Sequence, residues 1–343
     1  MKHFKLLLLS FFFSEILYAQ DIHFSQFYAA PLQLNPAYTG VFNGNIRTVL
    51  NYRNQWQSFS PYNTFAGSLD FNFGQNMLKH DLFGVGVSFF SDKAGDSEFS
   101  TTQGNVSLSY IKTLGNKYSR NYLTVGFQGG FAQRSINPAN LTFGSQYNGY
   151  AYDGTIESGE TIALNSFTFL DLGAGLSWLY VPKNGINFYA GLAYHHLNEP
   201  DQSFYGTGDY LYMRTSVNAG AQIPLNDYFD ILPAFLVQIQ GPHYEFMGGL
   251  HLKYNMETKA SQDQALSFGL WHRMGLDELS NYQIDASVIS LRYEIFGLSA
   301  GLSYDINISA LSDATNSLGG PELSLIYAVP LPHRDRKVDC PKF

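Results

Sequence analysis

Two adjacent histidines, His195 and His196, are the side chains of this 343-residue chain that most resemble part of a catalytic site. A hydrolase needs a Ser–His pair with an orienting group, and His196 is the candidate base. Because neighbouring residues of a strand face opposite ways, we expect these two rings not to share a metal ion. The sequence has no G-x-S-x-G or H-E-x-x-H motif and a single cysteine, Cys340. We therefore expect no catalytic residue, no cofactor and no metal site.

The other side chains that could bind a ligand lie in one long polar stretch, Gln133–Asn165. Its acidic residues lack the D-x-D-x-D-G spacing of a calcium loop, so they give only a weak Ca²⁺ signal; they are Asp153, Glu157 and Glu160. Tyrosine is enriched in binding surfaces. The candidate partner-binding residues of the stretch are Tyr147, Tyr150 and Tyr152. The stretch either presents these rings to a partner or folds over the rest of the molecule and packs on itself.

The segment Asn45–Phe59 indicates which kind of element positions these residues. Read with a period of two, one of its faces is mainly apolar and carries Ile46, Thr48, Leu50, Tyr52 and Trp56. The opposite face is mainly polar and carries Arg47, Val49, Asn51, Arg53, Gln55 and Gln57. Successive strand side chains alternate between faces, so the segment is a strand. It exceeds the five or six residues usual in globular proteins and suits a strand that crosses a bilayer, which needs about 9–11 residues.

The same alternation recurs along the chain. The further segments are 64–73, 82–90, 103–112, 122–132, 170–181, 186–196, 211–223, 229–240, 244–256, 266–274, 282–291, 296–306 and 322–329. Charged residues are 14% of the chain, aromatic residues 16%, and there are 32 glycines. This mixture is typical of a surface that faces lipid on one side and a polar interior on the other. We predict an all-β fold, a transmembrane antiparallel β-barrel of about 14 strands and outer-membrane type, over residues 45–330.

Charged residues within the predicted strands should face the lumen, because an Arg or Lys on the lipid face costs about 2–4 kcal/mol at the bilayer midplane. These residues are Arg47, Arg53, Asp70, Arg214, Glu245, Arg273, Asp285 and Asp305. We expect them to pair there and to seal the interior, in preference to lining a substrate channel. The net charge of −8 argues against a nucleic-acid partner.

The ends of the chain fall outside the barrel by pattern. Residues 1–19 have the basic start, apolar middle and small residue of a signal peptide. Residues 20–44 contain Pro31 and Pro36 and do not alternate, so we expect a periplasmic segment whose aromatic rings either plug the lumen mouth or lie against the rim. Residues 331–343 should form a periplasmic tail. With an even strand number both termini are then periplasmic, and the longer connections, above all Gln133–Asn165, are extracellular.

Several stretches resemble the PorP/SprF family of type IX secretion outer-membrane proteins. They are F-S-Q-F-Y-A-A-P-L-Q-L-N-P-A-Y-T-G from Phe24, N-Y-R-N-Q-W up to Trp56, N-P-A-N-L-T-F-G-S-Q-Y from Asn137, Y-D-I-N-I-S-A-L from Tyr304, E-L-S-L-I-Y from Glu322, and the terminal C-P-K-F. The resemblance implies a barrel that supports export or display of large surface proteins, including gliding adhesins, and that has no enzymatic activity. Its structural signature here is Asn35, Pro36, Tyr38, Gly40, Arg53, Asn54, Gln55 and Trp56, which we expect to hold the N-terminal segment against the first strand.

The leading hypothesis is a non-enzymatic outer-membrane barrel that binds the C-terminal domain of a secreted adhesin. The resemblance also implies contact with periplasmic components of the type IX secretion ring, and the barrel itself implies contact with outer-membrane lipid. The alternatives are a diffusion channel for small molecules and a hydrolase that depends on His196.

Overall fold

The structure, a computed structural model, describes residues 21–55, 62–74, 81–95, 97–116, 119–159, 164–182, 186–205, 208–256, 264–276, 282–309, 312 and 318–329. Outside these ranges lie the predicted signal peptide and the C-terminal tail with Cys340. Two residues singled out by sequence also lie outside them, Trp56 and Glu160. Among the described residues, no helix is long and apolar enough to cross a membrane.

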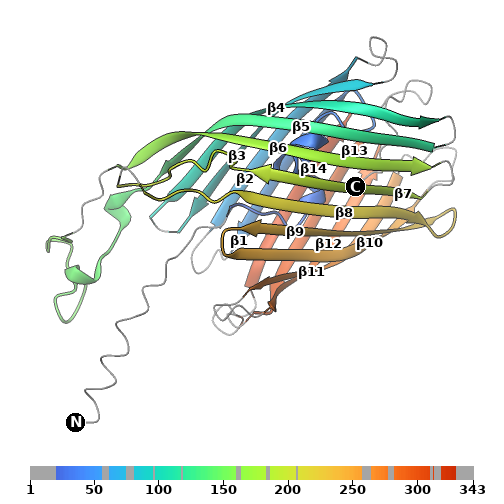
Figure 1. The fold of residues 1–343 in the computed structure, drawn as a ribbon. Coiled ribbons are helices and arrows are strands. Elements are labelled where there is room, and N and C mark those ends of the chain that lie inside the picture. Colours follow the sequence, from blue (N-terminus) through green and yellow to red (C-terminus); the bar gives the residue numbers. More distant parts are fainter. Residues whose placement is uncertain are drawn as a thin grey trace.

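The described chain forms fourteen strands that close into one barrel, each next to its neighbour in sequence, with the last strand paired to the first (Figure 1). The strands are β1 (Ile46–Gln55), β2 (Tyr62–Phe73), β3 (Leu82–Ala94), β4 (Phe99–Asn116), β5 (Ser119–Ser135), β6 (Ser166–Pro182), β7 (Asn187–His195), β8 (Arg214–Pro224), β9 (Phe229–Gln240), β10 (His243–Asn255), β11 (Gln264–Leu276), β12 (Tyr282–Ile295), β13 (Leu298–Asn307) and β14 (Leu318–Ala328). All pairings are antiparallel, including β1 with β14. The predicted fold class is confirmed.

Alternation builds the wall as predicted. On β1, Arg47, Asn51 and Arg53 are buried, whereas Leu50 and Tyr52 are about two-fifths exposed, at 39% and 40%. The same exposure of large apolar side chains recurs on all the other strands. A belt of apolar side chains therefore faces outward and a polar set faces inward, which is the arrangement that a bilayer requires of a spanning barrel.

The barrel has two unlike ends. The end that bears the β5–β6 connection (136–165) and the β7–β8 connection (196–213) is here called the loop rim, and the opposite end, with the short β8–β9 (225–228) and β12–β13 (296–297) connections, the turn rim. At the loop rim β6, together with β5 that pairs along it, extends beyond β7, because β6 pairs with β7 only from Ala174 onward. Long connections thus gather at one end, as expected from the sequence.

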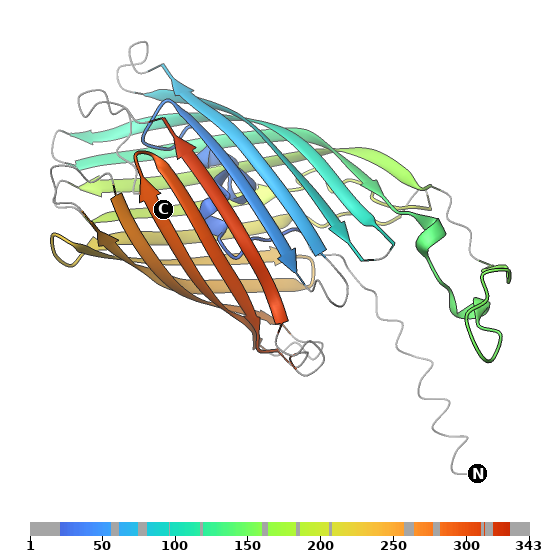
Figure 2. The same ribbon diagram turned by 180° about the vertical axis from the view of Figure 1, so that it is seen from behind.

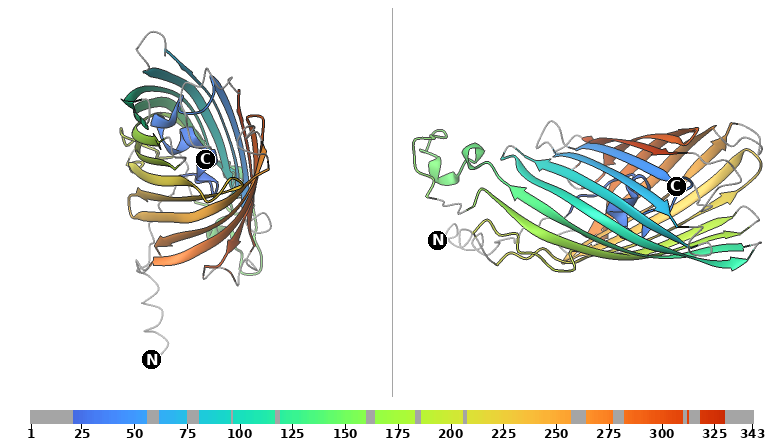
Figure 3. Two further views of the ribbon diagram at one scale, coloured as in Figure 1. Left: turned by 90° about the vertical axis from the view of Figure 1, so that its right-hand side faces the viewer. Right: turned by 90° about the horizontal axis from the view of Figure 1, so that it is seen from above.

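Residues 21–44, here called the plug, lie inside the barrel (Figures 2 and 3). The plug contains three short helical turns, η1 (Phe27–Ala29), α1 (Pro31–Leu34) and η2 (Pro36–Tyr38). Its aromatic rings are buried at 8% exposure or less. Of the two placements that the sequence left open, the lumen mouth and the rim, the structure favours the lumen, and the segment lies deeper in it than the mouth. Pro31 and Pro36 do keep the segment out of the sheet, and its apolar rings find cover within the lumen.

Because the plug passes through the lumen, the two ends of the described chain lie at opposite rims of the barrel. Asp21 meets Arg214, the first residue of β8, and Gln240, the last residue of β9, so it lies at the loop rim. The strand β14 ends at Ala328 at the turn rim. The described chain therefore begins at the loop rim and ends at the turn rim, because the plug crosses the lumen before β1 begins.

Candidate functional site

The first contact of the plug with the wall is made at the loop rim by Asp21. Its carboxylate accepts a hydrogen bond from His196 and lies 3.2 Å from Nη1 of Arg214. The other ring nitrogen, Nδ1 of His196, lies 2.8 Å from Asp171 on β6. Both nitrogens of the candidate base are thus held by carboxylates in a buried site. This geometry ties the plug to the wall and does not resemble a base poised for a serine.

The two histidines both turn inward, contrary to the sequence prediction. The strand β7 ends at His195, and His196 takes a left-handed backbone conformation with φ of 57°. The alternation of a strand therefore stops between them, and both side chains are buried, with His195 contacting the carbonyl of Leu34. Burial lowers the pKa of His196, but the carboxylates of Asp21 and Asp171 outweigh it and raise the pKa to about 9. His196 is thus a cation at neutral pH.

A charge cluster fixes the next part of the plug in the half of the lumen near the loop rim. The Asp305 carboxylate on β13 binds Arg53 of β1 at 2.9 Å and Arg273 of β11 at 3.0 Å, so two strands on either side of β13 share one anion. Arg53 also donates to the plug carbonyl of His23 at 2.6 Å. The predicted inward pairing of strand charges is confirmed for these residues.

The side chain of Glu322 on β14 receives the plug backbone directly. Its two oxygens each accept a hydrogen bond of 2.8 Å, from the amides of Ser25 and Gln26. Glu322 is 1% exposed. A buried carboxylate with two amide donors fixes backbone direction as well as position.

The turn-rim end of the plug is held by Arg47 and Asp70. They form a buried ion pair with contacts of 2.9 and 2.8 Å. Arg47 also donates to the carbonyl of Tyr38 at 2.9 Å, and Asp70 accepts from the amide of Gly40 at 2.8 Å. Gly40 has φ of 75°, a conformation open to glycine at little cost. The Arg47–Asp70 pair therefore links β1 to β2 and also links these two strands to the plug.

The N-P-A-Y stretch is the centre of the plug. The Asn35 amide donates to the carbonyls of Leu176 on β6 and Leu192 on β7, at 3.0 and 3.3 Å, and its Oδ1 accepts from Ala37 at 2.8 Å, which caps η2. The Tyr38 hydroxyl accepts from Asn218 on β8 at 2.7 Å. Asn35, Pro36, Tyr38 and Gly40 thus lie together inside the barrel. Of the remaining signature residues, Arg53 binds the plug, Asn54 contacts Asn63 on β2, and Gln55 ends β1.

Inward-facing glycines of the wall make room for the plug. A Cβ at Gly126 would lie 2.4 Å from Pro36 and Ala37, one at Gly175 would lie 1.9 Å from Asn35, and one at Gly84 would lie 2.3 Å from Thr39. Real Cβ atoms do not come so close. Sequence reasoning missed this relation, although a run of inward glycines in a predicted barrel is a signal that something other than wall side chains fills the lumen.

Aromatic packing closes the lumen on the β10–β11 side. The Tyr28 ring stacks on Trp271, with centroids 5.4 Å apart, and meets His251 edge-on at 4.9 Å. The cavity left beside them has about 20 Å³, lined in part by Tyr189 and Leu232. A void of that size holds about one water molecule. The described side chains are thus closely packed at this point of the lumen.

The β5–β6 connection projects beyond the wall, as the green segment of Figures 1 and 2 shows. It packs on itself through two short turns, η3 (Pro138–Asn140) and η4 (Gly144–Gln146), and a bridge between Tyr147 and Tyr152. Its base is tied to both neighbouring connections, from Asn137 to Ser97 and from Leu164 to Phe204. The tip does not fold over the mouth. The exposed fractions of Tyr147, Tyr150 and Tyr152 are 58%, 95% and 53%.

The residues that sequence singled out therefore fall into two groups. The motif residues Asn35, Pro36, Tyr38, Gly40 and Arg53 lie in the lumen and form or hold the plug. The three tyrosines lie at the tip of the projecting connection. No group of three or more His, Cys, Asp or Glu side chains in the described part of the chain could hold a metal ion. Asp153 hydrogen-bonds to Thr155 within the connection.

A closed β-barrel with an apolar outer belt is the architecture of the outer-membrane β-barrel proteins. In this chain the plug fills the lumen of that barrel. The family model described as "Type IX secretion system membrane protein PorP/SprF" matches residues 16–327. The chain belongs to the PorP/SprF family, and it is an outer-membrane protein of this secretion system.

Comparison with solved structures finds other barrels. The toluene transporter TbuX of Ralstonia pickettii is 9% identical with a TM-score of 0.48, over 87% of this chain and 92% of that one. The toluene transporter TodX of Pseudomonas putida is 9% identical with a TM-score of 0.48, over 87% and 91%. The monoaromatic hydrocarbon channel CymD is 11% identical with a TM-score of 0.48, over 89% and 94%. No curated protein matches the chain.

Proposed function

We propose that this barrel is a non-enzymatic anchor of the type IX secretion system whose loop rim holds the C-terminal domain of a secreted adhesin. The observation that carries the proposal is the contrast between a filled lumen and a projecting connection with exposed tyrosines. The plug occupies the interior through which a small solute would pass, and His196 is bound on both ring nitrogens. The tip with Tyr147, Tyr150 and Tyr152 offers an exposed aromatic surface to a partner.

In the same proposal the loop rim faces the cell exterior and the turn rim faces the periplasm, near the secretion ring. Short turns on the periplasmic side and long connections outside are the rule for bacterial barrels. Orientation is tested in a Cys340→Ser background. Tyr150→Cys should then react with a membrane-impermeant maleimide on intact cells, and Asn226→Cys in the β8–β9 turn should react only after lysis. The reverse pattern would invert the assignment.

Cargo binding is tested by replacing residues 138–158 with a short Gly-Ser linker. The barrel should still insert, because the replaced residues lie beyond the ends of β5 and β6, and an adhesin C-terminal domain fused to a reporter should no longer co-purify. Alanine at Tyr147, Tyr150 and Tyr152 together should weaken capture at least about tenfold, since buried tyrosines often contribute more than 1 kcal/mol each at interfaces.

The matched control is Tyr205→Ala with Tyr210→Ala on the neighbouring β7–β8 connection, where the exposed fractions are 69% and 61%. This pair should leave capture unchanged. Normal capture by the linker variant would refute the assignment of cargo to the β5–β6 connection. A steady ion current through the unmodified barrel in a planar bilayer would favour the diffusion channel instead.

A further inference from the structure

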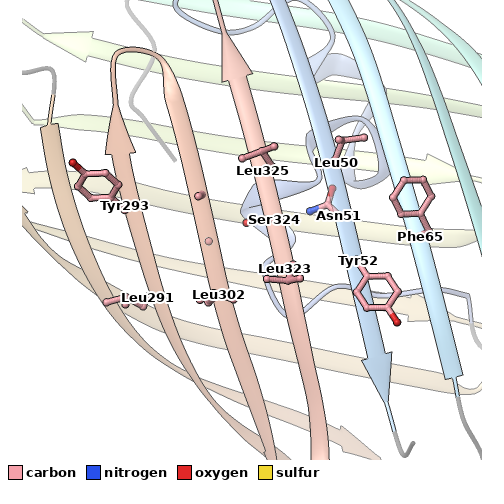
Figure 4. A pocket seen from close by; sticks show the side chains of 12 residues that line it. Leu50, Asn51, Tyr52, Phe65, Leu291, Tyr293, Leu302, Leu323, Ser324 and Leu325 are labelled. Atoms are coloured by element: carbon pink, nitrogen blue, oxygen red, sulfur yellow. The ribbon is translucent and has the colours of Figure 1, made fainter.

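The outer face of the barrel carries a groove over β12, β13, β14, β1 and β2, with a volume of about 490 Å³ (Figure 4). It crosses the seam where β14 pairs with β1. The groove lies on the outward belt, since Leu50, Leu302 and Leu323 belong to the exposed apolar set.

Two rows of paired side chains make the walls of the groove. One row follows the strand register through Tyr293, Ala300, Leu325 and Leu50. The other follows it through Leu291, Leu302, Leu323, Tyr52 and Phe65. Rows two residues apart are separated by about 7 Å along the strands, and five strands span about 19 Å. The groove is therefore a channel that runs across the strands.

The depth of the groove comes from one small outward residue. Ala300 on β13 lies in register between Tyr293 on β12 and Leu325 on β14. Its larger neighbours stand on both sides of it, so the row has a gap at its centre. The glycine that follows, Gly301, makes room for Gln26 of the plug on the inner side of the wall.

Asn51 and Ser324, which also line the groove, turn their polar atoms away from it. The Asn51 amide donates to the plug carbonyl of Ala29, and the Ser324 hydroxyl donates to Gln26, both inside the lumen. The groove thus offers hydrocarbon contacts to a ligand. It contains no donor or acceptor from these two side chains that could orient a polar partner.

We propose that this groove holds one acyl chain of an outer-membrane phospholipid. The groove is continuous with the lipid-facing belt, so hydrocarbon reaches it without desolvation of any polar group. Its length of about 19 Å is close to the depth of one leaflet, about 15 Å of a hydrocarbon core of about 30 Å. Strands of such barrels are tilted by about 35–45°, so a chain that lies across them crosses the seam obliquely to the bilayer normal. The site is separate from the cargo-binding rim.

The test uses purified full-length barrel in vesicles of phosphatidylethanolamine that carries a photoactivatable diazirine on one acyl chain. Peptides from β12, β13, β14 and β1 should be labelled several-fold more than the outward residues of β7 and β8. Ala300→Phe fills the centre of the groove and should lower this labelling several-fold, because the ring occupies the space that the acyl chain would take.

The matched control is Ala219→Phe, which adds the same ring at a small outward position of β8. It should leave seam labelling unchanged, and heat-modifiable mobility shows that each variant is a folded barrel. Even labelling around the barrel, or seam labelling that Ala300→Phe does not lower, would overturn the proposal. Cargo capture by Ala300→Phe should stay normal, which separates this site from the rim.

Discussion

Replacing Gly126 by alanine should unseat the plug while the barrel wall remains folded. The new Cβ would lie 2.4 Å from backbone atoms of Pro36 and Ala37. Contacts below 3.0 Å do not occur for real Cβ atoms, so the plug backbone has to shift by roughly 0.6 Å or more. Overpacking of this kind costs about 1–3 kcal/mol.

The shift also strains the hydrogen bonds of Asn35. Its amide lies 3.0 Å from Leu176 and 3.3 Å from Leu192, so a movement of this size breaks at least the longer bond. Loss of one or both bonds adds about 1 kcal/mol each, which brings the total to about 2–5 kcal/mol. Since 1.4 kcal/mol is a factor of ten, the unseated population should rise by about thirty- to several-thousand-fold.

The assay is ion conductance of the purified barrel in a planar bilayer, with heat-modifiable mobility as the measure of wall folding. Gly126→Ala should give open-channel events that the unmodified barrel lacks. The control is Gly173→Ala on β6, where the nearest atom to the new Cβ is a wall carbonyl, that of Tyr194, at 3.2 Å. A silent Gly126→Ala barrel with a normal wall would show that the plug is not held by this close contact. Equal conductance from both variants would point to general damage.

Three further predictions follow from the contacts at the loop rim. The pKa of His196 of about 9 lies above its unfolded value of about 6.5, so its contact with Asp21 stabilises fully below about pH 6.5 and is lost as pH rises through about 9. Proteolytic cleavage within the plug just after Asp21 should therefore speed up above pH 9, and His196→Ala should remove that dependence. Asp305→Asn leaves two buried guanidinium groups without their shared anion and should cost about 3 kcal/mol, against about 1 kcal/mol for Ser303→Ala, measured by urea unfolding in detergent; equal losses would refute the charge argument. An epitope placed ahead of Asp21 should be accessible to antibody on intact cells and one after Val329 should not, and exposure of both would contradict the crossing of the lumen by the plug.

The strands of the wall could be predicted from the sequence because the alternation that places their side chains is a local pattern. A period of two assigns each side chain to lipid or lumen, and Arg47, Leu50 and Arg53 all lie where that rule places them. The pairing of Arg47 with Asp70 follows from the same rule, since an inward charge needs an inward partner. Fourteen strands follow from repetition of this one pattern.

The plug was not predictable in the same way, because residues 21–44 have no period and their partners are distant in sequence. Asn35 binds carbonyls 141 and 157 residues away. The sequence did carry an indirect sign, the inward glycines Gly84, Gly126 and Gly175, which leave space that wall side chains do not fill. His196 was misplaced for a different reason. One left-handed φ value ends the alternation of β7, and no composition rule specifies it.

The wall and the plug are held by different kinds of interaction, and this difference makes them separable. Wall charges pair mainly with wall charges, as Arg47 does with Asp70 and Arg53 with Asp305. The plug residues these arginines meet offer backbone groups, such as the carbonyls of Tyr38 and His23. Within residues 21–44, Asp21 is the sole carboxylate and the chain has no Lys or Arg there. Loss of the plug therefore leaves the strand ion pairs intact and exposes backbone acceptors to water, which can satisfy them. Seating of the plug should accordingly be a transition distinct from closure of the barrel.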